Sequence, residues 1–221
     1  MTYPPARPTA TVPGTTTPRA AKELDDTADL AIDTFARCFN DMFPRIVDEL
    51  FAEAERETDR TRQSRILDAY GLVRSNRDRI EKEFRSSIAE IVRERIAMRP
   101  QKNQDYATRT INFDKLALVD DTEIEADIII RRLVSQLRKT DNPTDEEELR
   151  NLDARLSHLL GKSDIPDKEN PFSADALARA IEHAFRELAT EQEVQLEILR
   201  TFESFAAEAF NPAYQKINTH L

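Results

Sequence analysis

The stretch "LAIDTFARCFNDMFPRIVDELF", residues 30–51, decides the fold class. Its apolar side chains recur mostly three or four positions apart, the spacing that places side chains on one face of an α-helix. The residues of this stripe are Leu30, Phe35, Phe39, Met42, Phe43, Ile46, Leu50 and Phe51. Pro44 lies within the run, and because proline donates no backbone hydrogen bond we expect a kink or a division of the helix near Met42. The stretch predicts an amphipathic helix with one buried face.

The same period continues to the end of the chain. A second helix is expected from near Asp59 to Gly71, and a third from a cap at Ser75 or Asn76 to Pro100. Four more periodic segments follow, and Pro212 should end or kink the last of them. Only three glycines are present, and the one strand-like piece, "RTINF", is short. The sequence therefore predicts an all-α, irregular helical bundle of about seven helices.

Two segments depart from the helical pattern. Residues 1–20, "MTYPPARPTATVPGTTTPRA", are rich in proline and threonine and contain no acid, which predicts a disordered N-terminal tail. Residues 21–221 form the predicted helical domain. Within it, residues 100–117 break the period over a length unusual for a loop. This connection either packs across the bundle or joins two subdomains.

Five acidic side chains crowd the start of the fourth predicted helix, in the stretch "DDTEIEAD". A calcium-binding loop is one interpretation, but Ala126 stands where such a loop needs glycine and Arg132 where it needs glutamate. A helix start is the better interpretation, because acids in a first turn are favoured by the helix dipole. Asp121 or Thr122 is the predicted cap, the latter in a capping box with Glu125.

Three later helices carry similar start signals. Thr144 and Thr190 each stand three residues before a glutamate, the spacing of a capping box, and Ser173 precedes the helix that follows "NPF". These residues are predicted to accept hydrogen bonds from backbone N–H groups, which is a structural role.

The charge balance bears on the choice of partner. Lys and Arg number 32 against 42 Asp and Glu, a formal net charge of −10, which disfavours binding to a nucleic-acid backbone. The segment 56–102 is nevertheless rich in arginine, and acids are interleaved with it, as on a salt-bridged helical surface. The candidates for a basic surface are Arg74, Arg77, Arg85, Arg93, Arg95 and Arg99.

No motif of an enzyme, cofactor site or metal site is present in the sequence. The three glycines form no phosphate-binding or nucleophile motif, the three histidines form no paired motif, and Cys38 is the only cysteine. We therefore predict no catalytic, cofactor-binding or metal-binding residues. No run reaches the length of a membrane span and no apolar leader precedes the helices, so we expect a cytoplasmic protein that does not enter a membrane.

The order of four segments resembles a known family. They are "TRQSRILDAYGLVRSNRDRIEKEF", "LALVDDTEIEADIIIRRL", "LDARLSHLLG" and "NPFSADALARAIEHAFREL", and the resemblance runs from near Arg60 to Leu221. In this order and spacing the chain resembles the N-terminal portion of the bacterial domain of unknown function 1631 family. That resemblance implies no catalytic residues.

We predict a non-catalytic protein-interaction or regulatory module. The helices are long and amphipathic, and positive charge is concentrated in the segment 56–102 of an otherwise acidic chain. Its expected partner is another protein or a second copy of itself, as a homodimer. Two alternatives stay open. The chain is an enzyme whose site is assembled from scattered residues, or it binds a nucleotide or nucleic acid through the segment 56–102.

Overall fold

The structure, a computed structural model, describes residues 18–97, 121–138, 143–160, 162, 165–186, 188 and 191–221. Over these residues the chain forms seven α-helices and no strand, which confirms the predicted all-α bundle. The helices are α1 (Pro18–Arg56), α2 (Arg60–Ser75), α3 (Arg77–Ala97), α4 (Asp121–Arg138), α5 (Pro143–Leu160), α6 (Ala174–Arg186) and α7 (Gln192–His220). Residues 1–17 of the predicted tail and the predicted connection at 100–117 lie outside the described residues.

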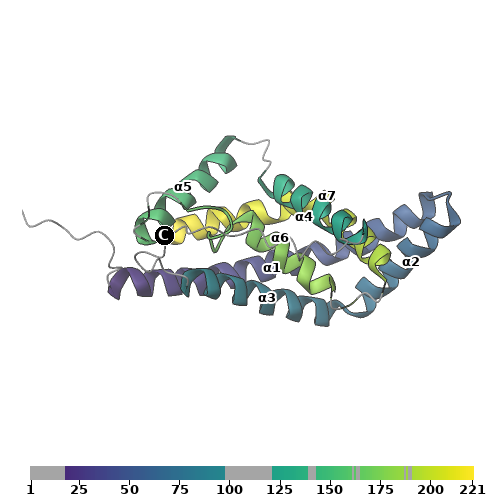
Figure 1. Cartoon of the computed structure of the whole chain (residues 1–221), viewed down its shortest axis with the longest axis horizontal. Coiled ribbons are helices and arrows are strands. Elements are labelled where there is room, and N and C mark those ends of the chain that lie inside the picture. Colours follow the sequence, from purple (N-terminus) through teal and green to yellow (C-terminus); the bar gives the residue numbers. More distant parts are fainter. Residues whose placement is uncertain are drawn as a thin grey trace, which may run out of the picture.

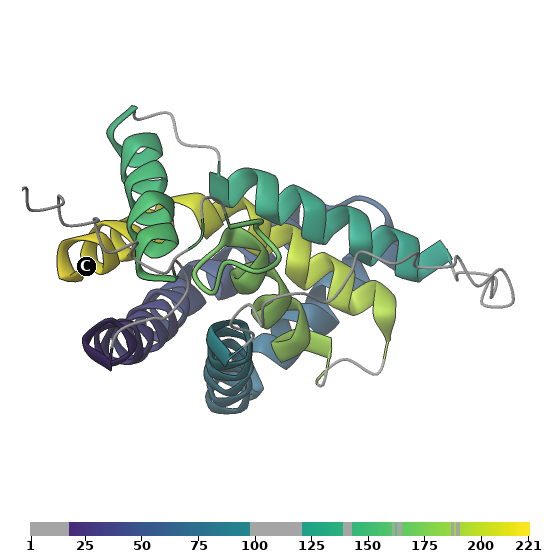
Figure 2. The ribbon, with the colours of Figure 1, turned by 60° about the vertical axis from the view of Figure 1, so that its left-hand side comes forward.

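Two long helices, α1 and α7, run along the bundle and contact each other. At one end α2 folds back along α1 after the short connection 57–59, and α7 packs against both (Figure 1). The helices α3 and α6 pair with each other beside α1, while α4 and α5 lie against α7 (Figure 2). The α1–α2 hairpin thus forms one end of the bundle, and α5 with the C-terminus of α7 forms the other.

The core centres on an aromatic cluster around Phe39, which is fully buried. Its ring stacks on Phe84 of α3 with 3.9 Å between the ring centroids. Phe43 and Phe202 each lie 5.2 Å away and Phe185 lies 6.1 Å away. These rings come from α1, α3, α6 and α7, so the cluster joins four helices. Ring–ring contacts of this kind stabilise a fold by more than the burial of their apolar area alone.

One of the two effects predicted for the prolines inside helices, the division or ending of the helix, is not found. The helix α1 continues through Pro44 and α7 continues through Pro212, so neither proline divides or ends its helix. Both prolines are exposed, and their neighbours Phe43 and Ala213 are buried. An interior proline costs about 3 kcal/mol, and burial of Phe43 and Ile46 around Pro44 and of Phe210 and Ala213 around Pro212 offsets this cost.

One other boundary and one face also differ from the sequence prediction. The helix α2 continues past Gly71 to Ser75, and the Asn76 N–H donates to the carbonyl oxygen of Leu72 at 3.0 Å to close it. On α1 the stripe is mostly buried from Leu24 to Ala54, but Leu30 is half-buried, and Phe51, predicted on that stripe, is 45% exposed. Phe51 follows Leu50 directly, and adjacent residues point about 100° apart around a helix, so only Leu50 faces the core.

Candidate functional site

The arginines predicted as a basic surface are mostly engaged by other groups. Arg85 pairs with Asp33 at 2.5 Å, and Arg93 pairs with Asp29 at 3.4 Å, so that α1 supplies the acids that face α3. Arg77 donates to the Asn40 side-chain oxygen at 2.6 Å. Arg99 lies outside the described residues. Arg85 and Arg93 therefore present paired charges, as the interleaved acids suggest, whereas Arg74 bonds the hydroxyl of Tyr70.

Arg95 does not lie on a surface, because its side chain is only 9% exposed. Its guanidinium donates to the carbonyl oxygens of Asp167 and Asn170 at 3.0 and 2.9 Å, and to Ser173 Oγ at 3.0 Å. A fourth bond, of 2.6 Å, reaches the carboxylate of Asp175 at the start of α6. Arg95 thus fastens α3 to the turn before α6, and this position is a structural one.

The carboxyl group of Asp175 responds to this environment. Burial raises its pKa, but hydrogen bonds from Arg179 and Arg95 outweigh burial, so the pKa of Asp175 lies below its usual range. Asp175 is therefore ionised at neutral pH and holds the two guanidinium groups together.

The predicted capping residues fall in two groups. Ser173 precedes α6, and its Oγ accepts from the Ala176 N–H at 3.2 Å and donates to the Asp167 carbonyl oxygen at 2.8 Å. The helix α4 begins at Asp121, with Thr122 next, and Thr144 is the second residue of α5. The side chains of these three residues, and all of Thr190, lie outside the part of the chain that the structure describes.

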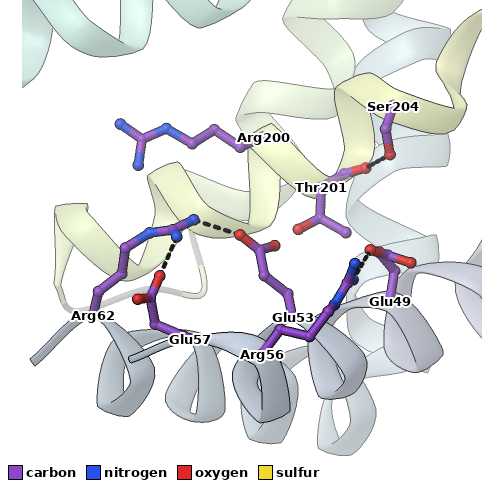
Figure 3. A pocket seen from close by; sticks show the side chains of 8 residues that line it. All are labelled: Glu49, Glu53, Arg56, Glu57, Arg62, Arg200, Thr201 and Ser204. Carbon is purple, nitrogen blue, oxygen red and sulfur yellow. Dashed lines mark hydrogen bonds and ion pairs between the residues drawn. The ribbon is translucent and has the colours of Figure 1, made fainter. Parts of the chain in front are cut away.

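A charged groove of about 530 Å³ lies at the hairpin end, between α1 and α7 (Figure 3). Arg62 of α2 is its hub and bonds the carboxylates of Glu53 and Glu57. It also lies 3.3 Å from Glu197 of α7, whose side chain is only 4% exposed. Arg56 reaches back along α1 to Glu49 at 2.6 Å. Ion pairs that line the groove therefore connect the α1–α2 hairpin to α7.

The pKa values in this groove follow its pairing. The pKa of Arg62 is raised, first by its hydrogen bond with Glu197, while burial opposes the rise. The pKa of Glu57 is lowered by the hydrogen bond from the Asp59 N–H and by Arg62. These directions show that Glu57 and Arg62 stabilise each other in their charged forms. Such groups hold helices together and are poorly suited to transfer protons at neutral pH.

On the outer side of the same hairpin, large apolar side chains are exposed next to one another. Phe51 of α1 is 45% exposed and Leu67 of α2 is 44% exposed. The ring of Tyr70 lies 5.6 Å from that of Phe51, and Arg74 donates to the Tyr70 hydroxyl at 2.7 Å. We call Phe51, Leu67, Tyr70 and Arg74 the hairpin face.

Sequence reasoning placed Phe51 on the buried stripe and so missed this face. The available signal was the pair of adjacent apolar residues on each helix, Leu50 with Phe51 and Ile66 with Leu67. One of each pair is fully buried, and the other is then turned toward solvent.

Comparison with known families gives one result. The model described as "Protein of unknown function (DUF1631) N-terminal domain" matches residues 19–221. The chain belongs to the DUF1631 family. The resemblance found in the sequence is thus confirmed, and the DUF1631 match begins within α1, well before Arg60. No curated protein and no solved structure matches the chain.

Two further observations concern the described part of this DUF1631 domain. None of its described helices is both long and apolar enough to cross a membrane. Among the same residues, no group of three or more His, Cys, Asp or Glu side chains is placed to hold a metal ion.

Proposed function

We propose that this DUF1631 domain is a non-catalytic protein-interaction module with a regulatory role, and that the hairpin face is its binding surface. The observation that carries the proposal is the exposure of Phe51 and Leu67 beside Tyr70 on two adjacent helices. Single exposed apolar residues are common on proteins, whereas a contiguous group is typical of an interaction site.

The composition of the hairpin face supports this role. Aromatic residues and arginine contribute most of the binding energy at many protein interfaces. Arg74 lies 5.8 Å from the centre of the Tyr70 ring and bonds its hydroxyl, so both side chains are already ordered before a partner arrives. Ordering side chains in advance lowers the entropy lost on binding.

The binding free energy available from covering the exposed apolar side chains is modest. Full burial of a Phe or Leu side chain contributes about 1.5–3 kcal/mol, so covering the exposed halves of Phe51 and Leu67 contributes about 1 kcal/mol each. Together they change a dissociation constant by about 30-fold, since about 1.4 kcal/mol corresponds to tenfold.

The nucleic-acid alternative receives less support from the geometry. Arg85 and Arg93 face acids of α1, and Arg95 is buried. A phosphate backbone would have to displace the paired carboxylates before it reached these guanidinium groups.

The test compares the full chain with the double variant Phe51→Ser, Leu67→Ser. Proteins captured from the host lysate are identified, purified and titrated against both chains by calorimetry. We expect a stoichiometric complex with the wild-type chain and binding weaker by at least about tenfold for the double variant. Equal binding by the two chains would contradict the hairpin face as the binding surface.

Ile128→Ser is the matched control. Ile128 is 47% exposed, as much as Phe51 and Leu67, but it lies on α4. This control should leave both the binding and the helical circular-dichroism signal unchanged.

A further inference from the structure

We propose that the hairpin face binds a second copy of this chain, with α1 of one copy against α2 of the other around a two-fold axis parallel to the hairpin. This inference rests on the proposed function and specifies its partner. It is carried by the charges that flank the exposed apolar residues, because those charges differ in sign between the two helices.

The α1 side of the hairpin face is acidic. Asp48 and Glu55 stand three residues before and four residues after Phe51, which places all three on one face of α1. All three are exposed. Neither acid has an ion-pair partner among the described residues.

The α2 side of the hairpin face is basic. Arg60 and Arg74 each stand seven residues from Leu67, which is two helical turns and returns them to the same face of α2. All three are exposed. Asp68 is also exposed, but it follows Leu67 directly and is turned about 100° around the helix.

Two-fold symmetry makes this surface meet itself, so the direction of the axis decides which charges meet. A two-fold axis perpendicular to the two helices, in the plane of the hairpin, would place α1 of one copy against α1 of the other. The acidic residues of the two copies would then face one another. An axis parallel to the hairpin places α1 against α2 of the other copy. Acid then meets base on both sides, and Phe51 meets Leu67. The charges therefore favour the parallel axis.

The levels of one acid and one arginine, Asp48 and Arg74, agree with this arrangement. Phe51 contacts Tyr70, and the two helices run in opposite directions, so this contact sets their register. Asp48 lies three residues from Phe51, or about 4.5 Å along the axis, and Arg74 lies four residues from Tyr70, or about 6 Å in the same direction. In the dimer Asp48 of each copy is then level with Arg74 of the other.

The size of the hairpin face sets the expected strength of the dimer. The helix α2 has 16 residues, a length of about 24 Å, and two helices side by side are about 20 Å wide. The projected area of roughly 500 Å² per copy is at the small end for stable complexes, so we expect a dissociation constant of about 10–100 μM.

The experiment is sedimentation equilibrium of the full chain from about 1 to about 300 μM. We expect a monomer–dimer equilibrium in the wild-type chain. Asp48→Arg and Arg74→Glu should each raise the dissociation constant at least tenfold, because each places like charges together twice in the dimer. Mixing these two variants in equal amounts should restore dimerisation, since the mixed dimer contains two Arg–carboxylate pairs.

Asp68→Arg is the matched control, because it reverses an acid on the same hairpin without changing the proposed contact, and it should not weaken the dimer. The inference is overturned if the wild-type chain is monomeric over the whole range, or if the mixture of variants dimerises no better than each variant alone. Its failure is distinct from failure of the proposed function. A monomeric chain whose titrated partner still depends on Phe51 and Leu67 would refute only self-association, whereas a partner that ignores both residues would refute the hairpin face itself.

Discussion

Replacement of Arg95 by alanine should destabilise the fold strongly, although the sequence predicts that this arginine lies on a basic surface. Its side chain is 9% exposed and makes four polar contacts with the turn before α6 and with Asp175. Removing one partner of a buried ion pair costs about 3–5 kcal/mol. Arg179 still contacts Asp175 at 3.0 Å in the variant, so we expect a loss at the lower end, about 3 kcal/mol.

The assay is urea unfolding followed by far-UV circular dichroism, which reports the free energy of unfolding. Arg93→Ala is the matched control on the same helix, because Arg93 is 69% exposed and 3.4 Å from its acid. Exposed pairs of this kind contribute about 0–1 kcal/mol. The loss of unfolding free energy for Arg95→Lys should lie between those for Arg95→Ala and Arg93→Ala. A lysine keeps the positive charge but cannot donate hydrogen bonds in the several directions that a guanidinium can.

The pH dependence gives a second measure of the same contact. The pKa of Asp175 is lowered in the folded state, so its stabilising effect is complete above the ordinary aspartate pKa, about 4, and is lost as the pH falls through the lowered value. Asp175→Asn should therefore flatten the fall in stability below about pH 4. Equal losses for Arg95→Ala and Arg93→Ala would refute the reasoning about burial.

Three further outcomes are expected. Phe39→Ala should cost about 3–5 kcal/mol of unfolding free energy, because it removes a fully buried ring from the aromatic cluster; a urea-unfolding loss under about 1.5 kcal/mol would show that the cluster closes around the gap. Pro44→Ala should raise the thermal midpoint, since it restores a backbone donor on the exposed side of α1; a lower midpoint would mean that packing requires the proline. The full chain should show no steeply salt-dependent retention on immobilised DNA, because Arg85 and Arg93 are paired with acids; strong retention at low salt would restore the nucleic-acid alternative.

The sequence predicted the helical fold because its apolar period is long and repeated. Phe35, Phe39 and Ile46 were assigned to the core from spacing alone, and all three are fully buried. Proline was a poorer guide to where a helix is divided, because its local cost was weighed without the buried residues Phe43 and Ile46 around Pro44. Local rules therefore predicted the elements well and their continuity less well.

The candidate site could not be predicted in the same way, because it depends on tertiary contacts that the spacing of residues along the sequence does not show. Nothing local distinguishes Arg93 from Arg95, which lie two residues apart, yet one is exposed and the other is surrounded by the turn before α6. Likewise, only the contact of Phe51 with Tyr70 brings the exposed residues of α1 and α2 together. The hairpin face exists because two helices pack in one particular register.

The most direct test of the proposed dimer is disulfide cross-linking between two single-cysteine variants of the full chain, F51C and L67C, each also carrying C38S to remove the native thiol. The proposed dimer places position 51 of one copy next to position 67 of the other. On mild oxidation, the 51–67 cross-link should form faster than the 51–51 and 67–67 cross-links and should be suppressed by Arg74→Glu in both chains. Cross-links of all three kinds at equal rates, or none above the level of a control with I128C, would contradict the proposed dimer.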